Sequence, residues 1–149
     1  MTIMPAEARD LPLIVEMKLR MFREVGSITL LRDGAETQIA QTYKSLYEQD
    51  LLRHFIAYEA GQPVACGGAV IKEDVPFCFF RDPRYGYVMD VYVLPGHRRQ
   101  GLATRVVEAT LNWLREQGVR QVKLKPSGPA RGLYEKLGFR DDGEMSLWM

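Results

Sequence analysis

The residues best suited to binding chemistry follow a buried strand. Apolar, β-branched and aromatic residues fill positions 87–94 and predict a strand, which Pro95 and Gly96 end. Basic and small residues come next, and an amphipathic run then predicts a helix over about 101–117. A strand that feeds directly into a helix gathers unpaired backbone N–H groups and the positive end of the helix dipole at one spot. The sequence therefore predicts a binding site for a phosphate or pyrophosphate group.

The spacing within this loop narrows the choice of ligand. Residues 98–103 read Arg-Arg-Gln-Gly-Leu-Ala and fit the pattern Arg/Gln-x-x-Gly-x-Gly/Ala. Gly101 and Ala103 have little or no side chain, so a ligand can approach the backbone closely there. The loop lacks the Gly-Lys-Ser/Thr of a P-loop and the three glycines of a dinucleotide-binding fingerprint. The alternative is a tight strand-to-helix turn with an exposed basic loop and no ligand.

A second motif supplies a proton donor. Residues 133–139 read Leu-Tyr-Glu-Lys-Leu-Gly-Phe and predict the end of a short helix. A tyrosine phenol, with a pKa of about 10, stays protonated at neutral pH and can donate that proton to a basic atom of a ligand. The alternative for Tyr134 is a surface hydroxyl on an amphipathic helix, and Gly138 and Phe139 would serve as a helix cap and a core residue in either case.

The two motifs, in this order, resemble the acetyl-coenzyme A (acetyl-CoA) loop and the tyrosine helix of the GCN5-related N-acetyltransferases (GNAT). This resemblance implies an α/β (α+β) fold with a mixed, mostly antiparallel sheet of about six or seven strands flanked by about four helices. The residue patterns predict a single domain over 1–149. The expected strands are 2–4, 53–59, 63–71, 87–94, 119–125 and two more after Phe139, the last at 145–149; the expected helices are 10–25, 35–52, 101–117 and a short one ending at Gly138.

The resemblance also implies a set of cofactor-binding residues. The arm of acetyl-CoA would run along the strand at Val91, Tyr92 and Val93. Ser127 stands where many family members have Asn and would bond to the arm less favourably. Tyr134 would protonate the sulfur. Backbone amides of the loop would hold the pyrophosphate: Arg98, Arg99, Gln100, Gly101, Leu102, Ala103 and Thr104. We expect acetyl-CoA as co-substrate and no metal.

The residues that would bind the amine substrate, which accepts the acetyl group, are less well defined. An attacking amine has a pKa of about 10.4 in water and must lose a proton. Asp90, inside the central strand, is the first candidate for the general base; the alternative is a structural partner for a nearby arginine. Arg20, Glu24 and Tyr87 are candidates for binding the substrate, although the first two could equally belong to a solvated helix face.

Composition excludes several classes of protein. The chain has 149 residues and a net charge of only +1, which argues against nucleic-acid binding. Seven Arg or Lys residues against two Glu between positions 97 and 125 favour a small polyanionic ligand. No apolar run is long enough to cross a membrane, and the first residues lack the order of a signal peptide. Cys66 and Cys78 are expected to be small buried residues in a cytoplasmic protein.

These observations lead to one hypothesis and two alternatives. We expect an N-acetyltransferase that moves acetyl from acetyl-CoA to a primary amine of a small molecule. The first alternative is a protein or peptide acetyltransferase, which an open, shallow acceptor groove would favour. The second is a CoA-binding sensor without transferase activity, against which Tyr134 argues. A homodimer is compatible with all three.

Overall fold

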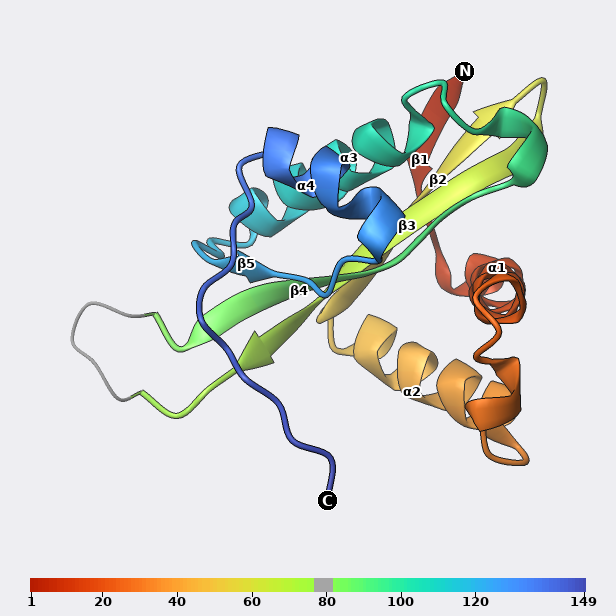
Figure 1. The fold of residues 1–149 in the computed structure, drawn as a ribbon. Coiled ribbons are helices and arrows are strands. Elements are labelled where there is room, and N and C mark those ends of the chain that lie inside the picture. The colour runs from red at the N-terminus through yellow and green to blue at the C-terminus, as the bar shows by residue number, and fades with distance from the viewer. Residues whose placement is uncertain (77–81) are drawn as a thin grey trace.

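One five-stranded sheet organises the protein. The computed structural model describes residues 1–76 and 82–149. The strands lie in the order β1-β2-β3-β4-β5, with β1 to β4 antiparallel and β5 parallel to β4 (Figure 1). Their bounds are Thr2–Pro5, Leu52–Glu59, Gln62–Glu73, Arg84–Val93 and Val122–Lys123.

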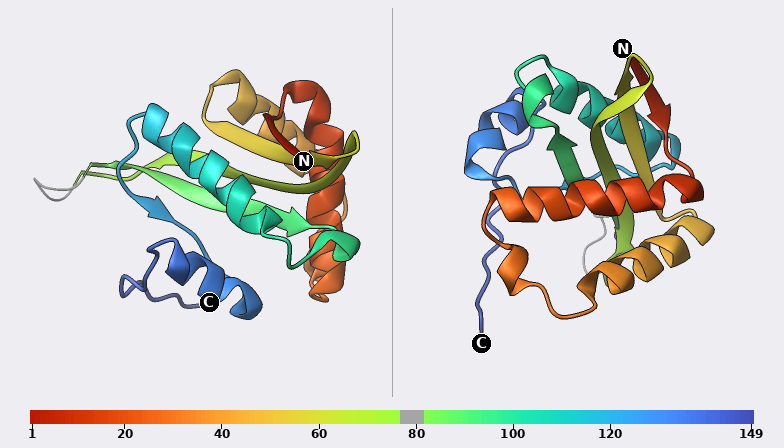
Figure 2. Two further views of the ribbon diagram at one scale, coloured as in Figure 1. Left: turned by 90° about the horizontal axis from the view of Figure 1, so that it is seen from above. Right: turned by 90° about the vertical axis from the view of Figure 1, so that its right-hand side faces the viewer.

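Four α-helices cover this sheet in the described part of the chain. They are α1 (Leu11–Glu24), α2 (Ala35–Glu48), α3 (Leu102–Glu116) and α4 (Arg131–Lys136). Helices α1 and α2 cover one face and α3 covers the other, with α4 on the α3 side beside β5 (Figure 2). The core is divided in the same way, because one apolar cluster lies under α1 and α2 and two lie under α3 and α4.

The helices differ greatly in how firmly they are buried. The apolar stripes of α1 and α3 place five and seven of their residues in the core, respectively. Helix α2 buries only Tyr43. Four further residues of α2 pack, partly buried, against the core: Ile39, Ala40, Leu46 and Tyr47.

The hairpin of β2 and β3 is confirmed, with a turn one residue shorter than the predicted Ala60-Gly61-Gln62. Glu59 pairs with Gln62, which leaves Ala60 and Gly61 as a two-residue turn. Both residues have positive φ, at 47° and 76°. This is the type I′ geometry that matches the twist of paired strands.

Strand β4 contains a bulge at its centre. Cys66 pairs with Tyr92 and Gly68 pairs with Met89, so that Asp90 and Val91 together face Gly67. Asp90 adopts φ 59°, in the left-handed region that residues other than glycine rarely occupy. Gly67 and Gly68 of β3 predict a bulge or a close backbone approach. The structure has both: the register shifts opposite Gly67, with the extra residue on β4, and the Arg53 carbonyl lies close to Gly68.

The expected sheet was too large. The structure has five strands where six or seven were expected, and β5 has two residues instead of spanning 119–125. The expected strands after Phe139, including 145–149, are not formed, because no neighbouring strand pairs with this exposed segment. Helix α2 ends at Glu48 and not at the expected position 52. The chain turns just after the helix, at Asp50, which has φ 55°. Cys78 and the rest of 77–81 lie outside the described residues.

No helix in the described part of the chain combines the length and the apolar character that crossing a bilayer would require.

Close packing between β2 and β3 gives a stability prediction. A Cβ at Gly68 would lie 2.7 Å from the Arg53 carbonyl oxygen and 2.5 Å from the fully buried His54 ring. We therefore expect Gly68→Ala to lower the free energy of unfolding by about 1–3 kcal/mol. Gly132→Ala is the control, because a Cβ there meets nothing within 4 Å and lies in α4. Urea denaturation measures both, and equal stability of the two variants would contradict the prediction.

Candidate active site

The loop between β4 and α3 is shaped to receive an anion. A 3₁₀ turn at Pro95–His97 follows β4, and α3 begins at Leu102. Arg99 and Gly101 have left-handed backbones, with φ 60° and 77°. Gly101 is the N-cap of α3, and no side chain caps the first amides of this helix. Those amides are available to an anion beside the positive end of the helix dipole.

The Arg98 side chain is directed toward the protein and not toward this loop. Its Nε donates to the Val93 carbonyl at 2.9 Å and its Nη2 donates to Glu24 Oε2 at 2.6 Å. The Tyr92 hydroxyl donates to the other Glu24 oxygen, and the Arg98 guanidinium lies 5.6 Å from the Tyr92 ring. The hydrogen bonds from Tyr92 and then Arg98 lower the pKa of Glu24. The Arg98 side chain thus connects the loop to the end of α1, although nearly half of it is exposed.

Strands β4 and β5 separate on the way to the loop. The two strands pair only at Gly86 with Val122 and at Tyr87 with Lys123. Beyond this point the chain after β5 turns away from β4 toward α4 (Figure 2), and we call the place where the two strands separate the opening. Among the described residues, no strand pairs with Val91, Tyr92 and Val93 on the β5 side, so the backbone groups of this edge are free to pair with an extended ligand.

Tyr134 combines a buried ring with an open hydroxyl. Its ring is 8% exposed, packs edge-on against Phe139 at 5.8 Å, and belongs to the same apolar cluster as Val91 of β4 and Val122 of β5. Every fully buried polar side-chain atom among the described residues has a hydrogen-bond partner, whereas the Tyr134 hydroxyl has none in that part of the chain. The hydroxyl must therefore reach solvent. Burial raises the pKa of Tyr134, which keeps the phenol protonated.

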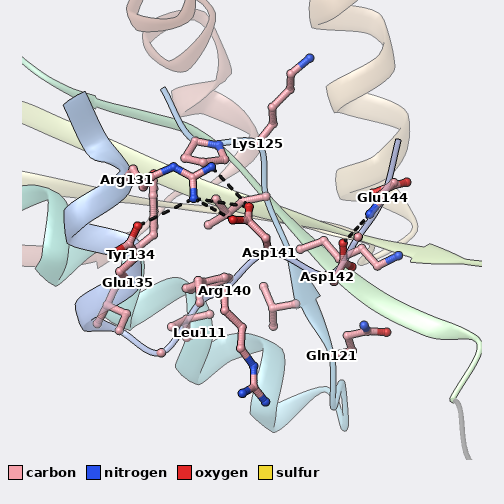
Figure 3. Close-up of a pocket in the computed structure, with 18 of the residues that line it drawn as sticks. Leu111, Gln121, Lys125, Arg131, Tyr134, Glu135, Arg140, Asp141, Asp142 and Glu144 are labelled. Carbon is pink, nitrogen blue, oxygen red and sulfur yellow. Dashed lines mark hydrogen bonds and ion pairs between the residues drawn. The ribbon is translucent and has the colours of Figure 1, made fainter. Parts of the chain in front are cut away.

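A cavity of about 670 Å³ lies beside Tyr134 on the outer side of β5. Side chains from α3, β5, α4 and the C-terminal segment line it, and Arg131 of α4 bonds to Asp141 of that segment at 3.2 Å (Figure 3). Its described walls include no residue of β4 or of the loop at 98–101. This cavity is therefore distinct from the opening between β4 and β5, and Tyr134 belongs to both. Ser127, just before α4, is exposed.

The expected substrate-binding residues do not form one group. Glu24 bonds to Tyr92 and Arg98. Arg20 lies on the exposed face of α1, paired with Glu16 at 3.1 Å. Tyr87 lies on the α1–α2 side of the sheet, half-buried, with the Lys72 ammonium 4.5 Å from its ring.

Asp90 lies in a buried polar cluster that the sequence did not reveal. Its Oδ1 accepts from Lys18 Nζ of α1 at 2.6 Å. Its Oδ2 accepts from the Tyr43 hydroxyl at 2.6 Å and from His54 Nε2 at 2.9 Å. The Tyr47 hydroxyl lies 2.8 Å from His54 Nδ1. We name Lys18, Tyr43, His54 and Asp90 the Asp90 cluster.

Comparison with known proteins agrees with this geometry. The profile of the Acetyltransferase (GNAT) family matches residues 16–139. The chain belongs to this family. A putative acetyltransferase of Bacillus subtilis (strain 168) is 29% identical over 92 residues, which are 62% of this chain and 56% of that protein. The chain therefore matches little more than half the length of that relative.

Solved structures share the GNAT fold. A predicted acetyltransferase of Clostridium acetobutylicum, solved with acetyl-CoA, is 24% identical with a TM-score of 0.86, covering 98% of this chain and 94% of its own. The aminoglycoside 6′-N-acetyltransferase AAC(6′)-IG of Acinetobacter haemolyticus is 20% identical with a TM-score of 0.73, covering 100% and 97%. The five-stranded sheet with helices on both faces is thus the GNAT architecture.

The surroundings of Asp90 argue against its expected role as the general base of this GNAT chain. Burial alone would raise its pKa, but the hydrogen bond and charge of His54, followed by those of Lys18, outweigh burial and hold the pKa well below its usual range. A carboxylate with such a low pKa is a weak proton acceptor, and three donors already occupy its oxygens. The alternative expectation, a structural partner for a cation, fits the geometry, with Lys18 in place of an arginine.

A signal for this cluster was present in the sequence. A carboxylate in the middle of an apolar strand is stable only if it is paired. Tyr43 and Tyr47 stand on one face of α2, and His54 stands in a strand of mainly apolar residues. The sequence did not show that these side chains meet Asp90, because the contacts join residues 36–72 positions apart.

The lowered pKa of Asp90 gives a prediction on stability against pH. Asp90→Asn leaves the Lys18 ammonium without its carboxylate, and we expect it to cost about 3–5 kcal/mol of unfolding free energy at neutral pH. A lowered pKa in the fold means that this contribution is complete above the pKa of an unfolded Asp, about 3.9, and is lost as the pH falls below that value. The stability difference from the parent should therefore narrow in acid.

Urea unfolding at a series of pH values measures that difference. Asp33→Asn is the matched control, because Asp33 is exposed, and its effect should stay within about 0.5 kcal/mol. A difference for Asp90→Asn that does not change between neutral pH and about pH 3 would show that Asp90 is not held ionised by the fold.

Proposed function

We propose that the chain transfers an acetyl group from acetyl-CoA to a primary amine of a small molecule, with Tyr134 as the general acid. The observation that carries this proposal is the position of Tyr134, whose ring shares a cluster with both strands of the opening while its hydroxyl reaches solvent. The loop between β4 and α3 (the α3 loop) lies beside the same opening, and the free amides at the start of α3 would bind the pyrophosphate.

The proposed chemistry is a direct transfer. The neutral amine attacks the thioester carbonyl carbon and the C–N bond forms. The C–S bond then breaks with its electron pair going to sulfur, which takes the proton of the Tyr134 hydroxyl as the bond breaks. Because a free thiol, with a pKa of about 8.5, is more acidic than a phenol, the tyrosinate is a strong enough base to regain its proton from water and reset the site. The extra proton on the attacking nitrogen goes to water, because Asp90 is already paired.

A small-molecule acceptor is the better supported of the two transferase hypotheses. AAC(6′)-IG, which shares the fold, is named for an aminoglycoside antibiotic. A protein or peptide acceptor remains the alternative, and the amine panel below separates the two. The cytoplasmic location rests on the sequence grounds given above.

Calorimetric titration with acetyl-CoA, followed by an amine panel read by thiol release, tests the proposal. The panel contains lysine, spermidine, glucosamine 6-phosphate, kanamycin and a lysine-containing peptide. Binding of acetyl-CoA, with release of the thiol when a small amine is added, supports the proposal. Release for the peptide alone supports a protein acetyltransferase, and binding without release supports a sensor. Absence of binding would overturn the assignment of the α3 loop.

Tyr134→Phe tests the general acid. The ring keeps its packing against Phe139, so we expect the affinity for acetyl-CoA to stay within about twofold while kcat falls on the order of 10²-fold. Because burial raises the pKa of Tyr134, the parent should retain its kcat up to at least about pH 10 if this phenol is the acid. An equal loss of affinity and kcat would show that Tyr134 only positions the cofactor. Tyr58→Phe, in β2 away from the opening, is the control.

A further inference from the structure

The left-handed backbone of Asp90 requires an explanation. For a residue other than glycine this conformation costs about 1–2 kcal/mol, and it persists only where the surrounding structure holds it. Asp90 is 4% exposed and stands at the centre of β4, where its bulge faces Gly67. A bulge beside a site commonly redirects the strand.

The side chain of Asp90 joins this bulge to three other elements. Lys18 comes from α1, Tyr43 from α2 and His54 from β2. The backbone is held as well, because Cys66 Sγ of β3 donates to the Asp90 carbonyl at 3.2 Å. Asp90 thus connects β4 with helices α1 and α2 and with strands β2 and β3.

These connections join the two halves of the proposed site. The free edge of β4 next to the bulge is where the cofactor arm is proposed to lie. Arg20 and Glu24, two of the candidates for binding the amine substrate, belong to α1. Tyr43, the partner of Asp90, is the single fully buried residue of α2. Its hydroxyl gives α2 a direct hydrogen bond to β4, in addition to the apolar packing of α2 on the core.

We propose that Asp90 is a positioning residue that fixes the bulge of β4 and seats α1 and α2 against it, so that acceptor and thioester meet in one relative geometry. This inference rests on the proposed acetyl transfer. A shift of about 1 Å between reacting groups can cost 10²-fold in rate without any loss of ligand binding. The cluster therefore acts on kcat through geometry and takes no proton in the reaction.

Tyr43→Phe is the main test, because it removes one hydrogen bond to Asp90 and keeps the ring of Tyr43 in the core. Thr110→Val is the matched control. Thr110 is fully buried in α3, and its hydroxyl bonds to the Val106 carbonyl at 2.8 Å, outside the cluster. Both variants lose one buried hydroxyl. Thermal unfolding should show the larger loss of stability for Tyr43→Phe, because its hydrogen bond is to a charged carboxylate and that of Thr110 is to a neutral carbonyl.

The two variants should differ in kinetics. With acetyl-CoA and the best amine of the panel, we expect Tyr43→Phe to lower kcat about tenfold while the acetyl-CoA affinity stays within about twofold. Thr110→Val should keep both values. If Tyr43→Phe keeps the parent kcat, or if Thr110→Val loses as much, the positioning role is overturned.

Asp90→Asn separates positioning from base catalysis. A positioning role lowers kcat at every pH and leaves the shape of the pH profile unchanged. Loss of the acidic limb of that profile, with a normal Tyr43→Phe variant, would make Asp90 the base and overturn the proposal. If Asp90→Asn does not fold, Lys18→Met replaces it, since Lys18 is the other cluster residue that contacts Asp90 from a helix.

Hydrogen–deuterium exchange gives a readout that does not need acetyl transfer. In Tyr43→Phe, amides of β4 around the bulge and of α2 should exchange faster than in the parent, whereas Thr110→Val should leave both segments unchanged. Unchanged exchange in Tyr43→Phe overturns the positioning role even if the enzyme is active. Faster exchange in a protein that binds no acetyl-CoA would keep the role of Asp90 in the fold and reject the proposed function alone.

Discussion

The buried carboxylate of Asp90 is the interaction on which the centre of this structure depends. Lys18, Tyr43 and His54 satisfy it from three different elements, and in return it holds a left-handed residue in the middle of a strand. An unpaired carboxylate at this depth would be strongly destabilising, so its partners cannot be removed independently. The bulge, the attachment of α2 and the direction of β4 are consequently parts of one arrangement.

The two faces of the sheet have separate tasks around that arrangement. On one face, α3 begins directly after β4 and leaves its first amides free, while Tyr134 of α4 stands beside the opening toward β5. On the other face, Glu24 at the end of α1 bonds to Tyr92 and Arg98, and so connects α1 to the start of the loop. The side chain of Arg98, an arginine of the loop motif, thus bonds to the protein framework.

The sequence predicted local features well and long-range ones poorly. The β4–loop–α3 unit, the turn at Ala60 and Gly61 and the family followed from short patterns, because each depends on neighbouring residues. The prediction of a strand at 145–149 was wrong, because a pattern of apolar residues does not reveal whether a partner strand is available. The Asp90 cluster was missed for a related reason, since burial predicts that a carboxylate needs partners but not which side chains provide them.

The slight burial of α2 has a consequence for how such a protein changes over time. Tyr43 is the one fully buried side chain of this helix, and only Ile39, Ala40, Leu46 and Tyr47 pack beside it on the core. The remaining positions of α2 can be exchanged without creating cavities, so substitutions there cost little stability. New surfaces can be tried on the outer face of α2 while the face of the sheet covered by α3 stays intact.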